Sequence, residues 1–349
     1  MDGDGWIPRE QILGAEAESR VPEQFQVQIP TVANPPTLLL AVEHVLRRAE
    51  PSAAVEVGAD GSLSAAQDPM REPIAAFLRD AYPKLTRWYG WFNRTQHGIR
   101  PLSYRWQVRS PGHCLPSGLD DYPRAEPPVD GEAHVDLLSW MAMFARSLST
   151  IAQTLGHSEE ALQWEEEHHA LLDALDPHWD DAQGWFFDLV VPTPTLQQLH
   201  DFQRRARHPV APHAGFVRHV GYVSAFPLLL RLLAPDDPRV GALLDNMLRP
   251  EVGLLSEFGL RSLASSDPAF KTGENYWRGK VWFNLNFLLL RALHTRYVRE
   301  GPYQEKARQL YKLVRSGVLR VTLQEFQRTG HLWENYDSES GKGTGTHPF

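Results

Sequence analysis

The sequence contains a single cysteine, Cys114, among its 349 residues. One thiol cannot form an internal disulfide, and it excludes a zinc site built from cysteines. The sequence also has no run of 18 apolar residues, and its first residues, MDGDGWIPRE, lack the basic and apolar regions of a signal peptide. We therefore expect no transmembrane segment in this chain, and we expect any targeting signal to lie outside it.

The chain has fewer positive than negative side chains, with 35 Lys and Arg residues, 43 Asp and Glu residues and a formal net charge of -8. This balance disfavours a nucleic-acid partner. The HExxH, GxSxG and dinucleotide-binding motifs are absent, and the run GKGTG at 341–345 lacks the spacing of a phosphate loop. The run EEEHH at 165–169 occupies successive helical positions that face different directions. The sequence therefore predicts no metal and no cofactor.

Helical periodicity dominates the chain, and strand patterns are scarce. The apolar spacing and the intervening turns predict helices over about 35–49, 71–91, 132–155, 158–175, 221–233, 237–248, 276–299 and 303–323. Short turns join several of these helices into antiparallel hairpins. Stacked hairpins without strands form either a closed toroid or an open solenoid. Because no repeat period is visible, the closed ring is favoured.

Three long irregular segments interrupt this helical pattern, at 100–128, 250–280 and 328–349. In a closed ring such loops gather around a central cavity, where chemistry is expected. The sequence also has 11 tryptophans, and several of them lie in segments that read as loops: Trp6, Trp106, Trp179, Trp185 and Trp333. Loop indoles either form apolar faces for sugar rings or fill seams between helices, and the sequence leaves both interpretations open for each one.

Two of these loops carry carboxylates in aromatic, turn-forming surroundings. The first contains SGLDDYPR at 117–124, and the third contains WENYD at 333–337 followed by a glycine-rich run. A glycosidase needs one acid and one base in environments that separate their pKa values. Without further information, Asp120 and Asp121 are equally consistent with turn or N-cap residues, and Glu334 with a solvated surface charge.

Four separated motifs in this chain resemble glycoside hydrolase family 63, the processing α-glucosidase I family. SGLDDYPR is similar to the acid-bearing segment of that family and to the SGWD segment of inverting trehalases, whereas WENYD, with the glycine-rich run and HPF, looks like the base-bearing segment. GWIPREQILGAEAESRVP at 5–22 and NYWRGKVWFNLNFLLLRAL at 275–293 also resemble the family pattern. The resemblance therefore extends over nearly the whole chain.

The resemblance implies that Asp120 is the general acid and Glu334 the general base of an inverting glycosidase. The two carboxyl groups would then lie about 6.5 to 9.5 Å apart, with the attacking water between them. It further implies that Asp121 holds Asp120 or binds a sugar hydroxyl, and that Arg124 pairs with either aspartate. The substrate-binding residues implied by the resemblance are Arg9, Glu10, Asp121, Tyr122, Arg124, Trp277, Arg278, Trp282, Trp333 and Tyr336. For Arg124 a structural role is an equal alternative, and for Trp282 a core position is the stronger one.

The chain departs from the family pattern in two respects. Ala15 occupies a position where the pattern has an acidic residue, which weakens the case for a sugar contact there. Family members also continue beyond HPF into a final helix and carry a β-rich N-terminal domain. We therefore expect residues 1–349 to form one catalytic (α/α)6 toroid, truncated at its C-terminus and without its last helix.

The activity implied by the resemblance is release of a terminal α-linked glucose from an oligosaccharide, the α-1,2-linked glucose of the N-glycan precursor, in the lumen of the endoplasmic reticulum. The resemblance also implies that full-length relatives are membrane-anchored. Two alternatives stay open: a catalytically inactive α-helical scaffold or carbohydrate-binding fragment, and a bacterial-type enzyme that acts on a shorter α-glucoside.

Overall fold

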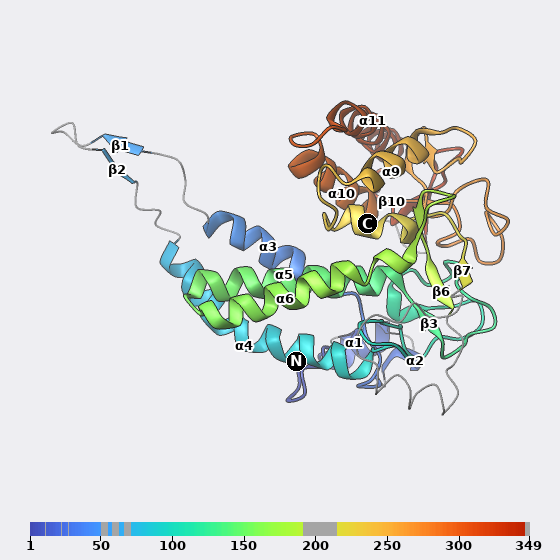
Figure 1. Ribbon diagram of the computed structural model, residues 1–349. Helices are drawn as coiled ribbons and strands as arrows, with labels where there is room; N and C mark the ends of the chain where they lie inside the picture. The colour runs from blue at the N-terminus through green and yellow to red at the C-terminus, as the bar shows by residue number, and fades with distance from the viewer. Residues whose placement is uncertain are drawn as a thin grey trace. The chain divides into compact units, whose positions relative to one another are not determined.

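The computed structural model describes residues 1–10, 12–21, 23–26, 28–49, 55–57, 63–65, 71–190 and 215–345 (Figure 1). The chain is rich in helix and divides into two compact units. Unit 1 comprises Met1–Gln96 and Trp140–Leu171, and unit 2 comprises His97–Ser139 and Leu172–Phe349. The long helix α5 (Val135–Leu155) begins in unit 2 and continues into unit 1.

Unit 1 is built mainly from helices. Besides α5 it contains α1 (Ala15–Arg20), α2 (Glu23–Gln26), α3 (Leu38–Ala49), α4 (Arg71–Thr95) and most of α6 (Ser158–Asp173), with the antiparallel strands β1 (Val55–Val57) and β2 (Leu63–Ala65). The expected helical hairpin is confirmed, because α5 and α6 run side by side (Figure 1) and the Ser149 hydroxyl donates to the Ala161 carbonyl at 3.0 Å. The strand pair was not predicted.

Helix α4 shows why these helices pack as they do. Its apolar residues Ile74, Leu78, Leu85 and Trp88 form a buried stripe, whereas Phe77 is 46% exposed. Tyr82 lies on the same stripe, and its hydroxyl donates to the Glu160 carboxylate of α6 at 2.7 Å. Burial and this hydrogen bond raise the pKa of Tyr82 to about 12. The carboxylates of α6 thus satisfy the polar atoms that α4 buries.

The helix run at 165–169 has the mixed orientation that its spacing predicts. Glu167 accepts a hydrogen bond from the Tyr89 hydroxyl at 2.6 Å, and His168 Nδ1 lies 2.9 Å from the Ala142 carbonyl. Glu165, Glu166 and His169 are exposed. The run is therefore partly packed against α4 and α5 and partly solvated.

Unit 2 combines helices with very short strands. Its helical elements are η1 (Leu115–Ser117), η2 (Asp176–His178), η3 (Val223–Ala225), α8 (Phe226–Leu229), α9 (Pro238–Leu248), α10 (Phe283–Ala292), the π-helix η4 (Leu293–Tyr297) and α11 (Gln304–Thr329). Its strands are β3 (Glu132–Ala133), β4 (Trp179–Asp180), β5 (Trp185–Phe186), β6 (Asp188–Val190), β7 (Gly215–Val217), β8 (Leu255–Ser256), β9 (Gly259–Leu260), β10 (Val281–Trp282), β11 (Asn335–Tyr336) and β12 (Gly343–Thr344). All of the strand pairs are antiparallel.

Two small sheets in unit 2 join segments that are far apart in sequence. One has the order β3-β6-β7, and the other has the order β10-β11-β12. In the second sheet Val281 pairs with Tyr336, and Asn335 pairs with Thr344. This sheet fixes the segment that contains Glu334 beside the segment that precedes α10.

The predicted helix over 276–299 is wrong at its beginning, since α10 starts only at Phe283. Residues 276–280 are irregular, and the backbone is left-handed at Asn275 (φ 52°), just before them, and at Gly279 (φ 135°), within them. Left-handed residues interrupt an α-helix. The predicted helix over 221–233 is likewise reduced to η3 and α8, and strand β3 precedes α5 where a helix from 132 was expected.

A buried ion-pair cluster fixes the first irregular loop onto the sheet and helix beneath it. The guanidinium of Arg124 donates to Asp136 Oδ2 at 2.5 Å and to Asp188 Oδ2 at 2.7 Å, and all three side chains are almost completely buried. Burial by itself lowers the pKa of Arg124, but the charges of Asp136 and Asp188 raise it well above its usual value. The prediction that Arg124 pairs with Asp120 or Asp121 is therefore wrong, and Arg124 is a structural residue.

Removing Asp136 takes two hydrogen bonds from the buried Arg124 guanidinium, which keeps only Asp188 among the described residues, and takes the acceptor from the buried Trp106 indole N–H. We expect Asp136→Ala to lower the free energy of unfolding by about 3–5 kcal/mol. As a control, Asp80→Ala removes an exposed ion pair with Lys84 at 2.7 Å and costs no more than about 1 kcal/mol. Urea unfolding monitored by circular dichroism measures both values, and equal costs for the two variants would contradict this account of the cluster.

Candidate active site

Asp120 lies in a tight turn that other parts of its own loop hold in place. The turn is closed by the Tyr122 amide, which donates to the Leu119 carbonyl at 3.1 Å, and the Asp120 carbonyl accepts the Cys114 amide at 2.7 Å. Gly118 precedes it with a left-handed φ of 69°. Asp120 is partly buried, whereas the adjacent Asp121 is almost completely buried. The turn thus presents two adjacent carboxylates to different surroundings.

Asp121 uses both carboxylate oxygens to hold the segment that precedes β10. Oδ2 accepts the Tyr276 amide at 3.0 Å, and Oδ1 accepts the Trp277 amide at 2.5 Å. Its backbone carbonyl accepts Arg278 Nε at 2.7 Å. Each oxygen accepts a backbone N–H and the residue is only 1% exposed, so Asp121 anchors this segment. Its predicted contact with a sugar hydroxyl stays a prediction.

Glu334, which directly precedes β11, contacts the same segment. The Tyr276 hydroxyl donates to Glu334 Oε1 at 2.5 Å. Glu334 Oε2 is buried and meets no hydrogen-bond donor in the part of the chain that the structure describes. A Cβ added at Gly345 would lie 2.9 Å from this oxygen, so the glycine-rich run packs directly against the carboxylate.

These contacts bring the two predicted catalytic loops to one place. Asp121 holds the backbone of Tyr276, and Tyr276 reaches Glu334 with the end of its side chain. Tyr276 therefore links Glu334 to Asp121, the neighbour of Asp120 in the turn.

Aromatic rings surround this junction. The rings of Trp277 and Trp282 stack at 3.8 Å with an interplanar angle of 7°, and Tyr276 meets Trp282 edge to face at 4.8 Å. Trp282 Nε1 donates to the Tyr276 carbonyl at 3.0 Å. Trp277 and Trp282 are both buried and pack against Tyr276, and their predicted contact with substrate stays a prediction.

Four other predicted residues take different positions. Tyr122 is buried, and its hydroxyl donates to the His219 carbonyl at 2.9 Å. Tyr336 is fully buried and stacks on Phe283 at 4.9 Å. Trp333 is partly buried against the core around Tyr336. Arg278 is partly buried and donates to Thr272 Oγ1 at 3.0 Å as well as to Asp121.

Arg9 and Glu10 belong to unit 1, not to the unit that holds Asp120 and Glu334. Arg9 Nε lies 3.8 Å from Glu10 Oε1, and the Glu10 amide donates to Gln28 Oε1 at 2.8 Å. The predicted contact of these two side chains with sugar hydroxyls stays a prediction.

Two residues outside the predicted set also contribute to this region, Tyr276 and Lys280. Both lie in the motif NYWRGK, which was the available signal. Burial lowers the pKa of Lys280, while the negative charges of Asp337, Asp121 and Glu334 act in the opposite direction. A half-buried ammonium group thus faces the carboxylates of this site and compensates part of their charge.

Comparison with known proteins identifies the family. A profile described as the glycosyl hydrolase family 63 C-terminal domain matches residues 1–349. The chain belongs to glycoside hydrolase family 63. A probable mannosyl-oligosaccharide glucosidase of Schizosaccharomyces pombe is 40% identical over 375 residues, which cover 100% of this chain and 44% of that protein. A mannosyl-oligosaccharide glucosidase of Arabidopsis thaliana is 34% identical over 377 residues, covering 99% and 42%.

This family 63 chain spans less than half the length of these two curated relatives. In fold it is similar to a family 63 mannosylglycerate hydrolase from Thermus thermophilus, solved in complex with glucose, with a TM-score of 0.65 and 16% identity. That match covers 99% of this chain and 81% of the solved chain. None of the described helices is both long and apolar enough to span a membrane.

Asp337 stiffens the family 63 segment that carries Glu334. Its Oδ1 accepts the Ser340 amide and hydroxyl, both at 2.8 Å, and its Oδ2 lies 3.3 Å from the Lys271 ammonium. Burial favours protonation, but the hydrogen bonds from Ser340 and Glu339 and the Lys271 charge lower the pKa of Asp337 to about 2. The folded state therefore favours the charged carboxylate over its protonated form.

This lowered pKa predicts a pH dependence of stability. A group whose folded pKa is depressed stabilises the protein above its unfolded pKa, near 3.9, and loses that contribution as the pH falls toward 2. We expect Asp337→Asn to cost about 1–2 kcal/mol at pH 7, after allowance for partial solvent exposure, and progressively less below pH about 4. Urea unfolding of the unaltered chain and of Asp337→Asn from pH 7 to pH 3 tests this. A difference in unfolding free energy that does not change with pH would contradict it.

Proposed function

We propose that this chain is the catalytic domain of an inverting glycoside hydrolase that releases a terminal α-linked glucose from an oligosaccharide. One observation carries the proposal: Tyr276 binds the Asp121 carboxylate through its amide and the Glu334 carboxylate through its hydroxyl. This arrangement brings Glu334 and the turn of Asp120 to the same junction. Family membership supports glycoside hydrolysis as the reaction.

In the proposed mechanism, Asp120 is the general acid. Its carboxyl group gives a proton to the glycosidic oxygen as the bond to the anomeric carbon breaks. Glu334 is the general base and takes a proton from a water that attacks the opposite face of the sugar, so the configuration inverts. Glu334 Oε2 suits this role because it is buried and has no protein hydrogen-bond donor among the described residues. Each turnover leaves Asp120 charged and Glu334 protonated, and exchange with water restores both.

The proposed substrate class follows from the relatives. Those from Schizosaccharomyces pombe and Arabidopsis thaliana are named mannosyl-oligosaccharide glucosidases. We therefore assign to this chain the terminal, α-1,2-linked glucose of a mannosyl-oligosaccharide, with the lumen of the endoplasmic reticulum as its compartment. The predicted single (α/α)6 toroid is part of this proposal, supported by the helix-rich fold and its likeness to the Thermus thermophilus structure.

The two carboxylates provide the direct test of the proposed reaction. Asp120→Asn and Glu334→Gln keep the shape of each side chain but remove the acid or the base, so we expect each to lower kcat/KM by about 10²- to 10⁴-fold. Release of glucose from a glucosylated mannosyl-oligosaccharide is measured with a coupled assay. Proton NMR during turnover should show β-glucose first.

A matched control is Asp130→Asn, which changes an exposed carboxylate paired with Arg105 at 3.0 Å in the same unit. It should leave kcat/KM unchanged. Initial release of α-glucose would overturn the inverting mechanism. A chain that releases no glucose from any α-glucoside would instead support the inactive, carbohydrate-binding alternative, and preference for a short α-glucoside would support the bacterial-type one.

Tyr276 gives a second, independent prediction. Tyr276→Phe removes the hydroxyl that donates to Glu334 Oε1 at 2.5 Å but keeps the backbone amide that binds Asp121. A carboxylate that loses a hydrogen-bond donor holds its proton more tightly. We therefore expect the acid limb of the kcat/KM profile to move to higher pH, with activity largely regained on the alkaline side of the limb.

The comparison variant for Tyr276→Phe is Tyr303→Phe, which removes a tyrosine hydroxyl next to α11, in the same unit but outside the site. Its pH profile should match that of the unaltered chain. A Tyr276→Phe profile that is lowered equally at every pH would mean that Tyr276 has only a packing role.

A further inference from the structure

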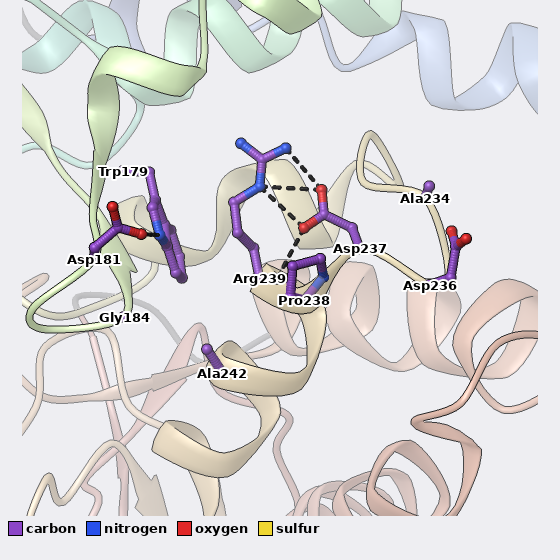
Figure 2. A pocket seen from close by; sticks show the side chains of 9 residues that line it. All are labelled: Trp179, Asp181, Gly184, Ala234, Asp236, Asp237, Pro238, Arg239 and Ala242. Atoms are coloured by element: carbon purple, nitrogen blue, oxygen red, sulfur yellow. Dashed lines mark hydrogen bonds and ion pairs between the residues drawn. The ribbon is translucent and has the colours of Figure 1, made fainter.

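Unit 2 contains an open groove that the proposed reaction does not use. Its volume is about 750 Å³, within the range of known ligand sites. Figure 2 shows the residues that line it: Trp179, Asp181, Gly184, Ala234, Asp236, Asp237, Pro238, Arg239 and Ala242. They come from the β4–β5 hairpin and from the start of α9 with the loop before it. None of them is among the predicted site residues.

The two larger walls of the groove are held rigidly. Trp179 Nε1 donates to Asp181 Oδ1 at 2.8 Å, and its ring meets the buried ring of Phe186 edge to face at 4.9 Å. Arg239 lies over the same Phe186 ring at 5.6 Å. Its guanidinium also donates to Asp237 Oδ2 at 2.7 Å (Figure 2). A further bond, to Asp176 Oδ1, is 2.7 Å long. Phe186 therefore supports an indole on one side and a guanidinium on the other, and little side-chain entropy remains to be lost on binding.

The charges in the groove exclude several ligand classes. The amide of Arg239 at the N-terminus of α9 already donates to Asp237 Oδ1 at 2.8 Å, and three lining carboxylates oppose a single guanidinium, so an anion is disfavoured. An ammonium ligand would lie beside the Arg239 charge and would meet only one ring face. The open shape and polar rim offer little to a lipid. The chemistry that remains is that of a neutral ligand with an apolar face and several hydroxyls.

A sugar ring has this chemistry. Its C–H face packs on an indole, and its vicinal hydroxyls form paired hydrogen bonds with planar groups such as carboxylates and guanidinium. Trp179 offers the indole, and Asp236 offers a carboxylate that makes no hydrogen bond or ion pair with any described residue. Ala234 and Ala242 add only a methyl group each to the lining of the groove.

The groove is also connected to the candidate active site through the chain. Phe186 at its floor ends β5, and two residues later Asp188 begins β6. Asp188 Oδ2 binds Arg124, which follows the Asp120 turn. Both sites are thus part of unit 2, held by neighbouring strands.

We propose that this groove binds the non-reacting mannose residues of the oligosaccharide whose terminal glucose is hydrolysed at Asp120 and Glu334. The mannose assignment rests on the proposed function, whereas the capacity to bind a neutral oligosaccharide rests on the groove alone. Binding energy from a remote part of the substrate that is equal in the ground and transition states lowers KM without changing kcat.

The first experiment measures binding of α-linked mannotriose, which has no glucose to release, to the full chain by isothermal titration calorimetry. We expect Trp179→Ala and Ala242→Phe each to weaken binding about tenfold or more, the first by removing the platform and the second by filling the groove. Ala76→Leu, an exposed enlargement on α4 in unit 1, is the matched control and should bind as the unaltered chain does. Thermal unfolding monitored by circular dichroism establishes that each variant is folded.

The second experiment separates this proposal from the proposed reaction. On a glucosylated mannosyl-oligosaccharide, Trp179→Ala and Ala242→Phe should raise KM several-fold with kcat unchanged, and on a nitrophenyl α-glucoside both constants should stay as they were. Normal mannotriose binding by either folded groove variant would overturn the groove proposal. Full activity of Glu334→Gln would instead contradict the proposed reaction, and it would not affect the conclusion drawn from mannotriose binding.

Discussion

The candidate site depends on one interaction, the pair of hydrogen bonds that the Asp121 carboxylate accepts from the amides of Tyr276 and Trp277. These bonds join segments more than 150 residues apart in sequence, and they are formed in a buried position where an unpaired amide or carboxylate would be costly. Because the Asp121 carboxylate accepts two backbone N–H groups, it orders the segment that also contacts Glu334. The general acid in the proposed mechanism is its neighbour, Asp120.

A second layer of buried charge keeps the Asp120 loop from moving. Arg124 is bound on one side by Asp136 at the start of α5 and on the other by Asp188 of β6. Such a cluster contributes little net stability relative to apolar packing, but breaking it is expensive. Its value here is geometric, since it specifies a single position for a loop that has no regular secondary structure of its own beyond one short η1 turn.

The sequence predicts the elements in which apolar residues recur at helical spacing. The helices α3, α4, α5, α6, α9 and α11 follow from apolar spacing. The loops of Asp120 and Glu334 were singled out by motif resemblance, and both contact the segment at Tyr276. The sequence does not predict single contacts. Arg124 was expected beside Asp120 or Asp121, but it binds Asp136 and Asp188. That choice of carboxylates depends on strands β3 and β6, whose two or three residues carry no periodic signal. Tyr276 was passed over for the same reason, because its role is defined by partners 155 and 58 residues away.

The failure of the helix prediction at 276 and the existence of the site have the same cause. In the predicted helix, Tyr276 and Trp277 would lie in the first turn, whose amides have no partner within the helix, and the later amides would bond to the carbonyls of residues 276–279. The left-handed residues Asn275 and Gly279 instead turn the backbone out of helical geometry, while Asp121 accepts the amides of Tyr276 and Trp277 and the indoles of Trp277 and Trp282 stack. The helix begins only at Phe283, once the backbone has left the site. Local propensity and tertiary function thus conflict over this one segment, as is expected where a fold builds a reactive centre.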